Sequence, residues 1–208
     1  MGEPKTRLRE NKEFELRGVN HLALVCKDMQ RTVDFYSNVL GMPLIKTIEL
    51  PGGMGQHFFF DIGRGDSLAF FWFPDSPDRA PGVASPAAMV GTGSIATAHG
   101  SMNHIAFDVA PEKMEEYRER LVAKGIEITE IVNHDNSPMQ ASPTVTDDVF
   151  VRSMYFFDPD GIMLEFAAWT RELRPDEAEH TGVGPADKEH YLQQQRDFIA
   201  KLRRASKP

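Results

Sequence analysis

Short apolar stretches alternate with amphipathic segments along this chain, and the whole alternation occurs twice. The first round begins with NHLAL at 20–24, and the second begins with NHIAF at 103–107. Each opening is followed by a polar break, a segment with apolar residues at helical spacing, a glycine and further short apolar stretches. His104 follows His21 by 83 residues (104 minus 21). This period is too long for a solenoid and indicates a duplicated βαβββ module.

The first module spans residues 18–73. Asp28 is a suitable N-cap for a helix, and Gly41 is suited to end it at the C′ position, where the backbone is left-handed. Apolar runs bounded by turn residues predict the strands of this module, which are at 19–25, 43–50, 57–61 and 68–73.

The second module spans residues 102–169 and repeats the plan. Pro111 is well placed in the first turn of a helix that ends at Gly125. The same signals predict strands at 103–109, 126–132, 151–157 and 162–168, a polar loop at 133–148 and a tight DPDG turn at 158–161. The sequence therefore predicts an α+β fold made of two tandem βαβββ modules.

Three further segments lack the module pattern. Residues 1–17 form a polar N-terminal arm. Residues 74–101, rich in Pro, Gly, Ala and Ser, connect the modules, and we interpret them as a passive linker in preference to a lid over a cavity mouth. The tail at 170–208 contains a helix predicted at 186–204, whose narrow apolar stripe could dock on the body or on a second subunit.

Composition narrows the function classes. A chain of 208 residues with 41% hydrophobic and 26% charged residues is typical of a soluble globular protein. The formal net charge of −8 argues against a nucleic-acid or acidic-membrane partner. The single Cys26 excludes an intrachain disulfide, and no apolar run approaches the roughly 20 residues that span a bilayer. These features favour a cytoplasmic protein.

Glu165 is the anomalous residue of the second module. It lies between Leu164 and Phe166 in a predicted strand, where a carboxylate is costly unless it is paired, hydrogen-bonded or bound to a metal. An edge-strand Glu that reaches solvent would explain it alone, and a hydrogen-bonded core imidazole would explain a single strand histidine. His21 and His104 occupy equivalent places in the repeat, however, and two His with one carboxylate form the facial triad that suits non-haem Fe(II). We therefore predict that His21, His104 and Glu165 converge on a single ion.

An alignment of the two modules gives these residues counterparts. Matching 58–61 with 155–158 makes Ala69, or alternatively Phe70, the counterpart of Glu165. The turn between the last two strands is then one residue shorter in the second module than in the first.

The alignment also predicts which way two rings point. Tyr155 lies on the strand joined to that of Glu165 by the DPDG turn, so it can point into the same cavity. His57 falls next to the position that matches Tyr155, so its ring is expected to face away. We predict a surface or intermodule contact for His57 in preference to a metal ligand.

The chain resembles the vicinal oxygen chelate superfamily in the stretches NHLALVCKDMQRTVDFYSNVLGMPL, NHIAFDV and YFFDPDGIMLEF. This superfamily includes glyoxalase I, type I extradiol dioxygenases, methylmalonyl-CoA epimerase and the bleomycin- and fosfomycin-resistance proteins. The resemblance covers roughly residues 18–170 and is more specific for the fold than for the reaction. It implies a cup-like mixed β-sheet around one metal with helices outside, ligands at His21, His104 and Glu165, and a homodimer, which in some members exchanges modules between chains.

Two positions bear on the branch of the superfamily. Glyoxalase I and the epimerases typically have a fourth protein ligand from the first module, where this chain has Ala69, which cannot coordinate. Tyr155 precedes Glu165 by ten residues, as does the active-site tyrosine of extradiol dioxygenases that hydrogen-bonds a substrate hydroxyl oxygen. Alternatively, Tyr155 only lines the cavity.

The acid/base histidine of the extradiol enzymes has no counterpart here. Met89 stands in the corresponding region, and the nearest histidines, His99 and His134, do not fall on the motif. The proton shuttle of that reaction is therefore not identified.

Three functions remain open. The favoured one is an extradiol-type dioxygenase that binds Fe(II), O2 and a catechol-like aromatic substrate, with Tyr155 stabilising charge on a substrate oxygen. The second is a lyase, isomerase or epimerase that uses a divalent ion such as Mn(II), Zn(II), Ni(II) or Co(II) as a Lewis acid. The third is a metal-free binding or resistance protein that encloses an aromatic ligand, with a lining of Phe58, Phe70, Phe71, Trp72 and Phe107.

Overall fold

The computed structural model describes residues 13–178 and 180–205, so most of the predicted N-terminal arm lies outside the described residues. The chain divides into a first unit that extends to Leu173 and a second unit that begins at Arg174. The first unit holds both modules. The second holds the short turns η4 (Pro175–Ala178) and η5 (Pro185–Asp187) and helix α3 (Lys188–Ala205), which confirms the predicted C-terminal helix.

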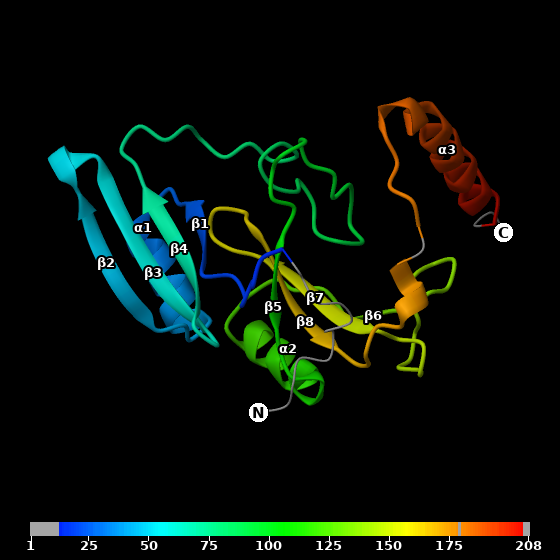
Figure 1. The fold of residues 1–208 in the computed structure, drawn as a ribbon, viewed down its shortest axis with the longest axis horizontal. Helices are drawn as coiled ribbons and strands as arrows, with labels where there is room; N and C mark the ends of the chain where they lie inside the picture. The colour runs from blue at the N-terminus through cyan, green and yellow to red at the C-terminus, as the bar shows by residue number, and fades with distance from the viewer. Residues whose placement is uncertain (1–12, 179, 206–208) are drawn as a thin grey trace. The chain divides into compact units, whose positions relative to one another are not determined.

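The first module is a four-stranded mixed sheet in the order β1-β4-β3-β2 (Figure 1). Its parallel pair is β1 (His21–Val25) with β4 (Asp66–Trp72), and its antiparallel strands are β2 (Leu44–Leu50) and β3 (Gly55–Gly63). Helix α1 (Met29–Val33) continues as the π-helical turn η1 (Asp34–Val39), and a 3₁₀ turn, η2 (Pro51–Gly53), joins β2 to β3. As predicted, the side chain of Asp28 caps α1 by accepting a hydrogen bond from the Arg31 N–H.

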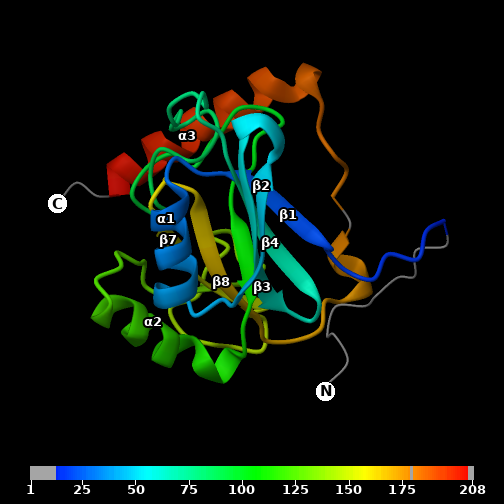
Figure 2. The same ribbon diagram turned by 90° about the vertical axis from the view of Figure 1, so that its left-hand side faces the viewer.

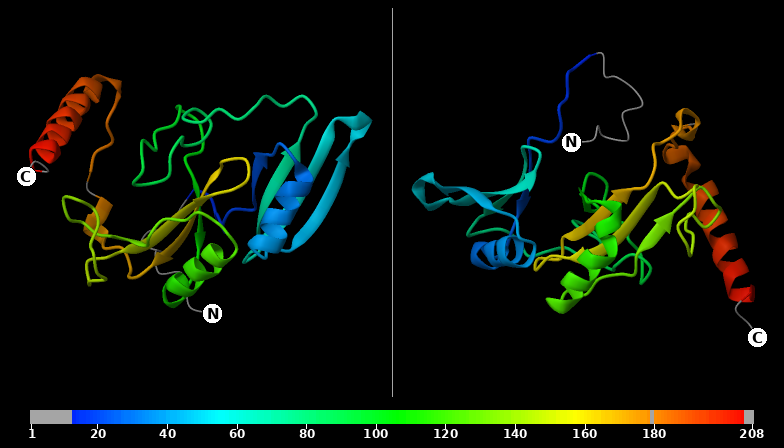
Figure 3. Two further views of the ribbon diagram at one scale, coloured as in Figure 1. Left: turned by 180° about the vertical axis from the view of Figure 1, so that it is seen from behind. Right: turned by 90° about the horizontal axis from the view of Figure 1, so that it is seen from below.

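The second module repeats this sheet in the order β5-β8-β7-β6. Its strands are β5 (Ile105–Asp108), β6 (Val132–His134), β7 (Val151–Phe157) and β8 (Met163–Trp169). A 3₁₀ turn, η3 (Pro111–Lys113), leads into helix α2 (Met114–Ala123). Figures 2 and 3 show α1 beside the first sheet and α2 beside the second. The predicted α+β fold of two βαβββ modules is confirmed.

The strand predicted at 126–132 is wrong. Strand β6 begins at Val132 and takes in Asn133 and His134, which the sequence assigns to a loop. Upstream of β6, the pairing of Thr129 with Tyr155 is irregular. The Thr129 N–H donates to the Tyr155 carbonyl, but the Tyr155 N–H donates to the Thr129 hydroxyl, at 3.0 Å, and not to a backbone carbonyl. Only a single isolated bridge, between Ile128 and Phe156, precedes β6 here.

One apolar core joins the two modules. It contains buried residues of the first module, among them Tyr36, Phe60 and Phe70, together with Leu121, Phe156 and Leu164 of the second. Burial of each such side chain contributes on the order of 2 kcal/mol. Because side chains alternate along a strand, the face of each sheet that carries His21 or Glu165 is the face opposite this core.

Polar contacts also join the modules. The Tyr36 hydroxyl donates a hydrogen bond to Asp158 Oδ2 at 3.1 Å, and both residues are buried. The Lys27 N–H donates to Asp160 Oδ2 at 3.0 Å. Within the described part of the chain, no helix is both long enough and apolar enough to cross a membrane.

Candidate metal centre

His104 and Glu165 form a close pair on the second sheet. His104 directly precedes β5, and Glu165 is the third residue of β8, which pairs with β5. Their closest atoms, His104 Nε2 and Glu165 Oε2, are 2.9 Å apart. Glu165 is only 5% exposed, so its carboxylate is held away from water and aimed at the imidazole. This arrangement explains the anomalous Glu of the sequence.

Each strand histidine is oriented by the asparagine before it. His104 Nδ1 lies 2.8 Å from Asn103 Oδ1, and His21 Nδ1 lies 2.8 Å from Asn20 Oδ1. The amide oxygen can only accept, so Nδ1 carries a proton in both histidines. In neutral His21 this leaves a lone pair on Nε2. In His104, Nε2 faces the Glu165 carboxylate, which also only accepts, so Nε2 donates to Glu165 here and must give up that proton to bind a metal. Such a partner commonly fixes the tautomer of a metal-binding histidine. The asparagines were not among the predicted site residues, although the repeated Asn-His pair was the signal that could have found them.

The environment of Glu165 favours its ionised form. Burial raises the pKa of this carboxyl, but hydrogen bonds from His104 and Ser153, the charge of His104 and a smaller effect of Tyr155 together outweigh burial, so the net pKa is lowered. Tyr155 lies beside the pair, with its ring centroid 5.8 Å from that of His104 and perpendicular to it. Burial, and then the charge of Glu165, raise the pKa of the Tyr155 phenol to about 12. The structure thus brings Tyr155, His104 and Glu165 together.

His21 does not join them within one chain. It belongs to the first sheet, where its ring meets the edge of Phe59 at a centroid distance of 5.6 Å. Across the described residues, no three His, Cys, Asp or Glu side chains lie close enough together to hold a metal ion. The prediction that both halves of one chain converge on an ion is therefore not met. The physical reason is the shared core, which occupies the inner faces of both sheets and turns the histidine-bearing faces away.

Strand register confirms that Ala69 is the counterpart of Glu165. Ala69 pairs with Ala23 and Phe59, just as Glu165 pairs with Ala106 and Tyr155. Phe59 is therefore the counterpart of Tyr155, and the sequence alignment of 58–61 with 155–158 is wrong by one residue.

That slip reverses the predicted direction of the His57 ring, because a shift of one residue moves a strand side chain to the other face. His57 shares the outer face of the first sheet with His21. Its ring stacks on Phe71 at a centroid distance of 3.6 Å and an angle of 11°. Burial, with a smaller effect of His21, lowers the pKa of His57.

The predicted aromatic lining is largely wrong for the same reason. Phe70 is fully buried in the core, and Phe58, Trp72 and Phe107 pack against that core. Only Phe71 of the five lies on a histidine-bearing face.

Segment 74–101 is not a passive linker. Met89 is 8% exposed and packs with Tyr155 and Met163 of the second sheet. The Asn103 side-chain amide donates a hydrogen bond to the Ile95 carbonyl at 2.6 Å. On the other side of Tyr155, His134 Nε2 lies 3.5 Å from the hydroxyl oxygen. The segment therefore forms one wall of the candidate site.

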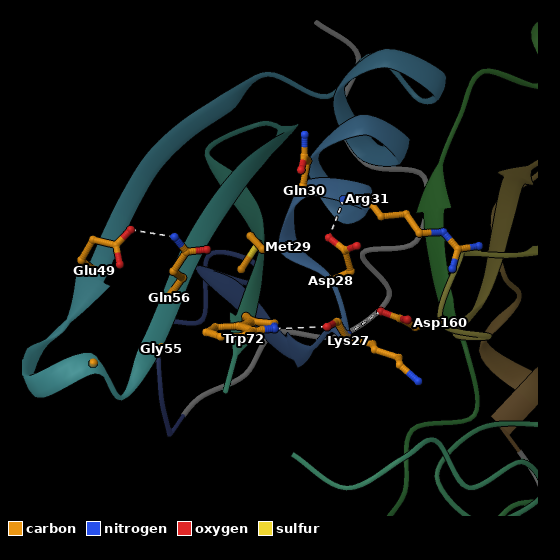
Figure 4. A pocket seen from close by; sticks show the side chains of 11 residues that line it. Lys27, Asp28, Met29, Gln30, Arg31, Glu49, Gly55, Gln56, Trp72 and Asp160 are labelled. Atoms are coloured by element: carbon orange, nitrogen blue, oxygen red, sulfur yellow. Dashed lines mark hydrogen bonds between the residues drawn. The ribbon is translucent and has the colours of Figure 1, made fainter. Parts of the chain in front are cut away.

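A cavity of about 700 Å³ opens elsewhere on the first unit (Figure 4). Its lining includes Gln56 and Trp72, which alternate with His57 and Phe71 and so lie on the opposite face of the sheet. Its polar groups largely bond one another: Gln56 donates to Glu49, and the Trp72 indole N–H donates to the Lys27 carbonyl. The cavity holds none of the candidate metal ligands.

The residues on the second sheet fit a divalent ion. A buried carboxylate and an oriented imidazole converge, and once Nε2 gives up its proton both are donors that Mn(II), Fe(II), Zn(II) and related ions accept. Two donors are fewer than such ions need in a stable protein site, and His21 presents the same oriented Nε2 on the first sheet.

Comparison with known proteins agrees with this fold. Residues 18–166 match the family described as the Glyoxalase/Bleomycin resistance protein/Dioxygenase superfamily. The chain belongs to this superfamily. Among its relatives, YwkD of Bacillus subtilis is 25% identical over 72% of this chain and 95% of its own length. The glutathione transferase FosA of Serratia marcescens is 26% identical over 72% of this chain and 79% of its own length. The crystal structure of SMU.1112c superposes with a TM-score of 0.51 and 26% identity, covering 74% of this superfamily member and 99% of that chain.

Proposed function

We propose that this protein is a divalent-metal enzyme whose site is completed by a second copy of the chain. His104 and Glu165 of one copy and His21 of the other hold the ion, and the reaction is non-oxidative group transfer, elimination or isomerisation on a small substrate with two adjacent oxygens. The observation that carries the proposal is the 2.9 Å His104–Glu165 pair on a sheet face turned away from the equivalent His21. A bound divalent ion supplies Lewis-acid polarisation of the substrate oxygens there.

The side chains around the pair have separate tasks. Asn20 and Asn103 accept hydrogen bonds from Nδ1 and so orient the two imidazoles for coordination through Nε2. The buried Glu165 supplies the negative charge that balances a cation in a site of low dielectric. Tyr155 is a hydrogen-bond donor at neutral pH, so it can hold a substrate oxygen beside the carboxylate. Met89 and its segment keep water from that side of the tyrosine.

The relative named for glutathione transfer supports the choice of chemistry. The position of Ala69 supports a set of three protein ligands, because the equivalent of Glu165 on the first sheet cannot coordinate.

The decisive experiment mixes two variants. His21→Ala and Glu165→Gln homodimers should each lose high-affinity metal binding, because each lacks one ligand at every site. Refolding an equal mixture should restore metal to about one quarter of the sites, because half of the dimers are mixed and each has one intact site. The measurement is metal content per chain after dialysis.

A matched control mixes His104→Ala with Glu165→Gln. Both variants lack a ligand on the second sheet, so every site in every dimer stays damaged and no recovery is expected. Recovery in this control, or none in the first mixture, contradicts the shared site.

A second candidate is ring cleavage by an extradiol-type dioxygenase with Fe(II). The observation in its favour is Tyr155, which lies beside Glu165 and ten residues before it in the sequence. Oxygen uptake with catechols by anaerobically iron-loaded protein, absent from the Zn(II) form, would favour this candidate. Turnover with Zn(II) or Mn(II) and no oxygen consumption would favour the first.

A further inference from the structure

The outer face of the first sheet carries a continuous aromatic surface beside His21. The rings of Phe73, Phe71 and His57 stack in a row: Phe73 and Phe71 are 5.3 Å apart at 9°, and Phe71 and His57 are 3.6 Å apart at 11°. Phe59 continues the row, 4.3 Å from His57 and 5.6 Å from His21. We call Phe59, His57, Phe71 and Phe73 the aromatic wall.

The aromatic wall is partly buried and still reaches the surface. All four rings are partly exposed, whereas Phe60 and Phe70, on the opposite face of the same strands, are fully buried. A contiguous exposed apolar patch typically marks a binding surface. Because His57 and Phe73 both stack on Phe71, ring faces are used within the row and ring edges are left for a ligand. Ring edges favour contact with the face of another aromatic ring over contact with a small polar molecule.

Cationic side chains are scarce around both histidine-bearing faces. Strand register puts Lys46, opposite Phe59, on the outer face of the first sheet, and it is the one Lys or Arg among the described strand residues of these two faces. The long segment at 135–150 contains neither Lys nor Arg, but Arg171 lies over the Phe150 ring and donates a hydrogen bond to the Asp148 carbonyl. Segment 74–101 contains only Arg79, which lies against Gly161 in the DPDG turn.

This distribution of charge is unsuited to a phosphonate. A doubly charged anion in a partly buried site needs several Arg or Lys donors, commonly in bidentate geometry. Fosfomycin is a small phosphonate, so similarity to FosA does not carry its substrate to this chain.

We infer that the substrate of the proposed metal site is a planar aromatic compound whose ring lies against the aromatic wall while two adjacent oxygens face the ion. This inference rests on the proposed function, since a second copy must bring the first sheet opposite His104 and Glu165. Phe59, His57, Phe71 and Phe73 are then specificity-determining residues, and phosphonates are excluded as substrates.

Two hydroxamates that differ only by a ring separate the inference from the metal site itself. Acetohydroxamate and benzohydroxamate present the same pair of oxygens to a metal, and only the second has a ring. Calorimetry with the full-length metal-loaded dimer should give metal-dependent binding of both, with benzohydroxamate about tenfold tighter. Phe71→Leu should reduce this ratio at least about threefold and leave the affinity for acetohydroxamate unchanged, which also shows that the variant is folded.

Phe198→Leu is the matched control, because Phe198 is a partly exposed aromatic of α3 in the other unit, and it should leave the ratio unchanged. Equal affinities of the two hydroxamates, or tighter binding of fosfomycin than of benzohydroxamate, would overturn the aromatic inference and leave the metal site intact. Absence of metal-dependent binding of either hydroxamate would overturn both.

Discussion

A pair of residues recurs in this molecule with the same geometry on both sheets. Asn20 with His21 and Asn103 with His104 make the same 2.8 Å contact between the amide oxygen and Nδ1. Folding alone does not require the asparagine contact at either histidine, because both histidines are exposed and could hydrogen-bond water. The shared geometry indicates that each Nε2 is prepared for the same kind of partner.

Asn103→Ala should therefore lower metal affinity about tenfold or more, because the imidazole loses its preferred tautomer and orientation. Asn103→Asp keeps the accepting oxygen and should keep the affinity, although it loses the bond to the Ile95 carbonyl. Asn20→Ala should lower metal affinity by about the same factor as Asn103→Ala. Competition calorimetry with Zn(II) measures these values, and Asn38→Ala, an exposed amide on η1, is the control. Unchanged affinity in Asn103→Ala would refute the orienting role.

The sequence was sufficient to predict that His104 and Glu165 lie close together on the second sheet. A carboxylate inside an apolar strand, with a repeated Asn-His pair, pointed to His104 and Glu165. It was insufficient for His57, since a slip of one residue in an alignment without gaps inverts a strand. Only the strand register of the structure, with Ala69 opposite Phe59, fixes which face each ring occupies.

At the scale of elements, local signals decided most boundaries. Helix caps and turn residues placed four segments within a residue or two: α1 together with η1, η3 together with α2, β7 and β8. The change from α-helix to π-helix at Asp34 was not predicted. The prediction of β6 failed because the start of this strand depends on a partner far away in sequence. The Thr129 hydroxyl binds the Tyr155 backbone, and regular pairing begins only at Val132. The prediction of a passive linker at 74–101 failed because the packing of this segment on Tyr155 leaves no periodic pattern in the sequence.

Met89→Ala tests whether that segment is held by the site. Met89 is 8% exposed against Tyr155 and Met163, and its truncation should cost about 2 kcal/mol of unfolding free energy. Cleavage within 74–101 by a nonspecific protease should accelerate under native conditions, because local opening becomes easier. Val83→Ala, at a residue 54% exposed in the same segment, should change neither value. A rate of cleavage equal to that of the unmodified protein would show that Met89 does not hold the segment.

At the scale of the whole molecule, the decisive feature is how the two modules pack. Sequence repetition gave two equal halves but no information on which faces meet. The shared core of Tyr36, Phe60, Phe70 and their partners puts the histidine-bearing faces outward, so one copy of the chain does not bring His21 to the pair of His104 and Glu165. A duplicated sequence is compatible with either packing, so this property could come only from the structure.

The bond between the modules should give folding stability a measurable pH dependence. Asp158 is 6% exposed, and burial raises its pKa from 3.8 to about 6, although it accepts hydrogen bonds from Tyr36, Asp160 and Ile162. Between pH 4 and 6 the folded protein therefore keeps a proton that the unfolded chain has lost, so this residue's contribution to stability falls as the pH rises. Asp158→Asn mimics the protonated form, and its stability relative to the unmodified protein should rise by on the order of 2–3 kcal/mol from pH 4 to 7. Urea denaturation across this range measures the difference, with the exposed Asp75→Asn as control; a difference independent of pH would show that Asp158 titrates as it does in the unfolded chain.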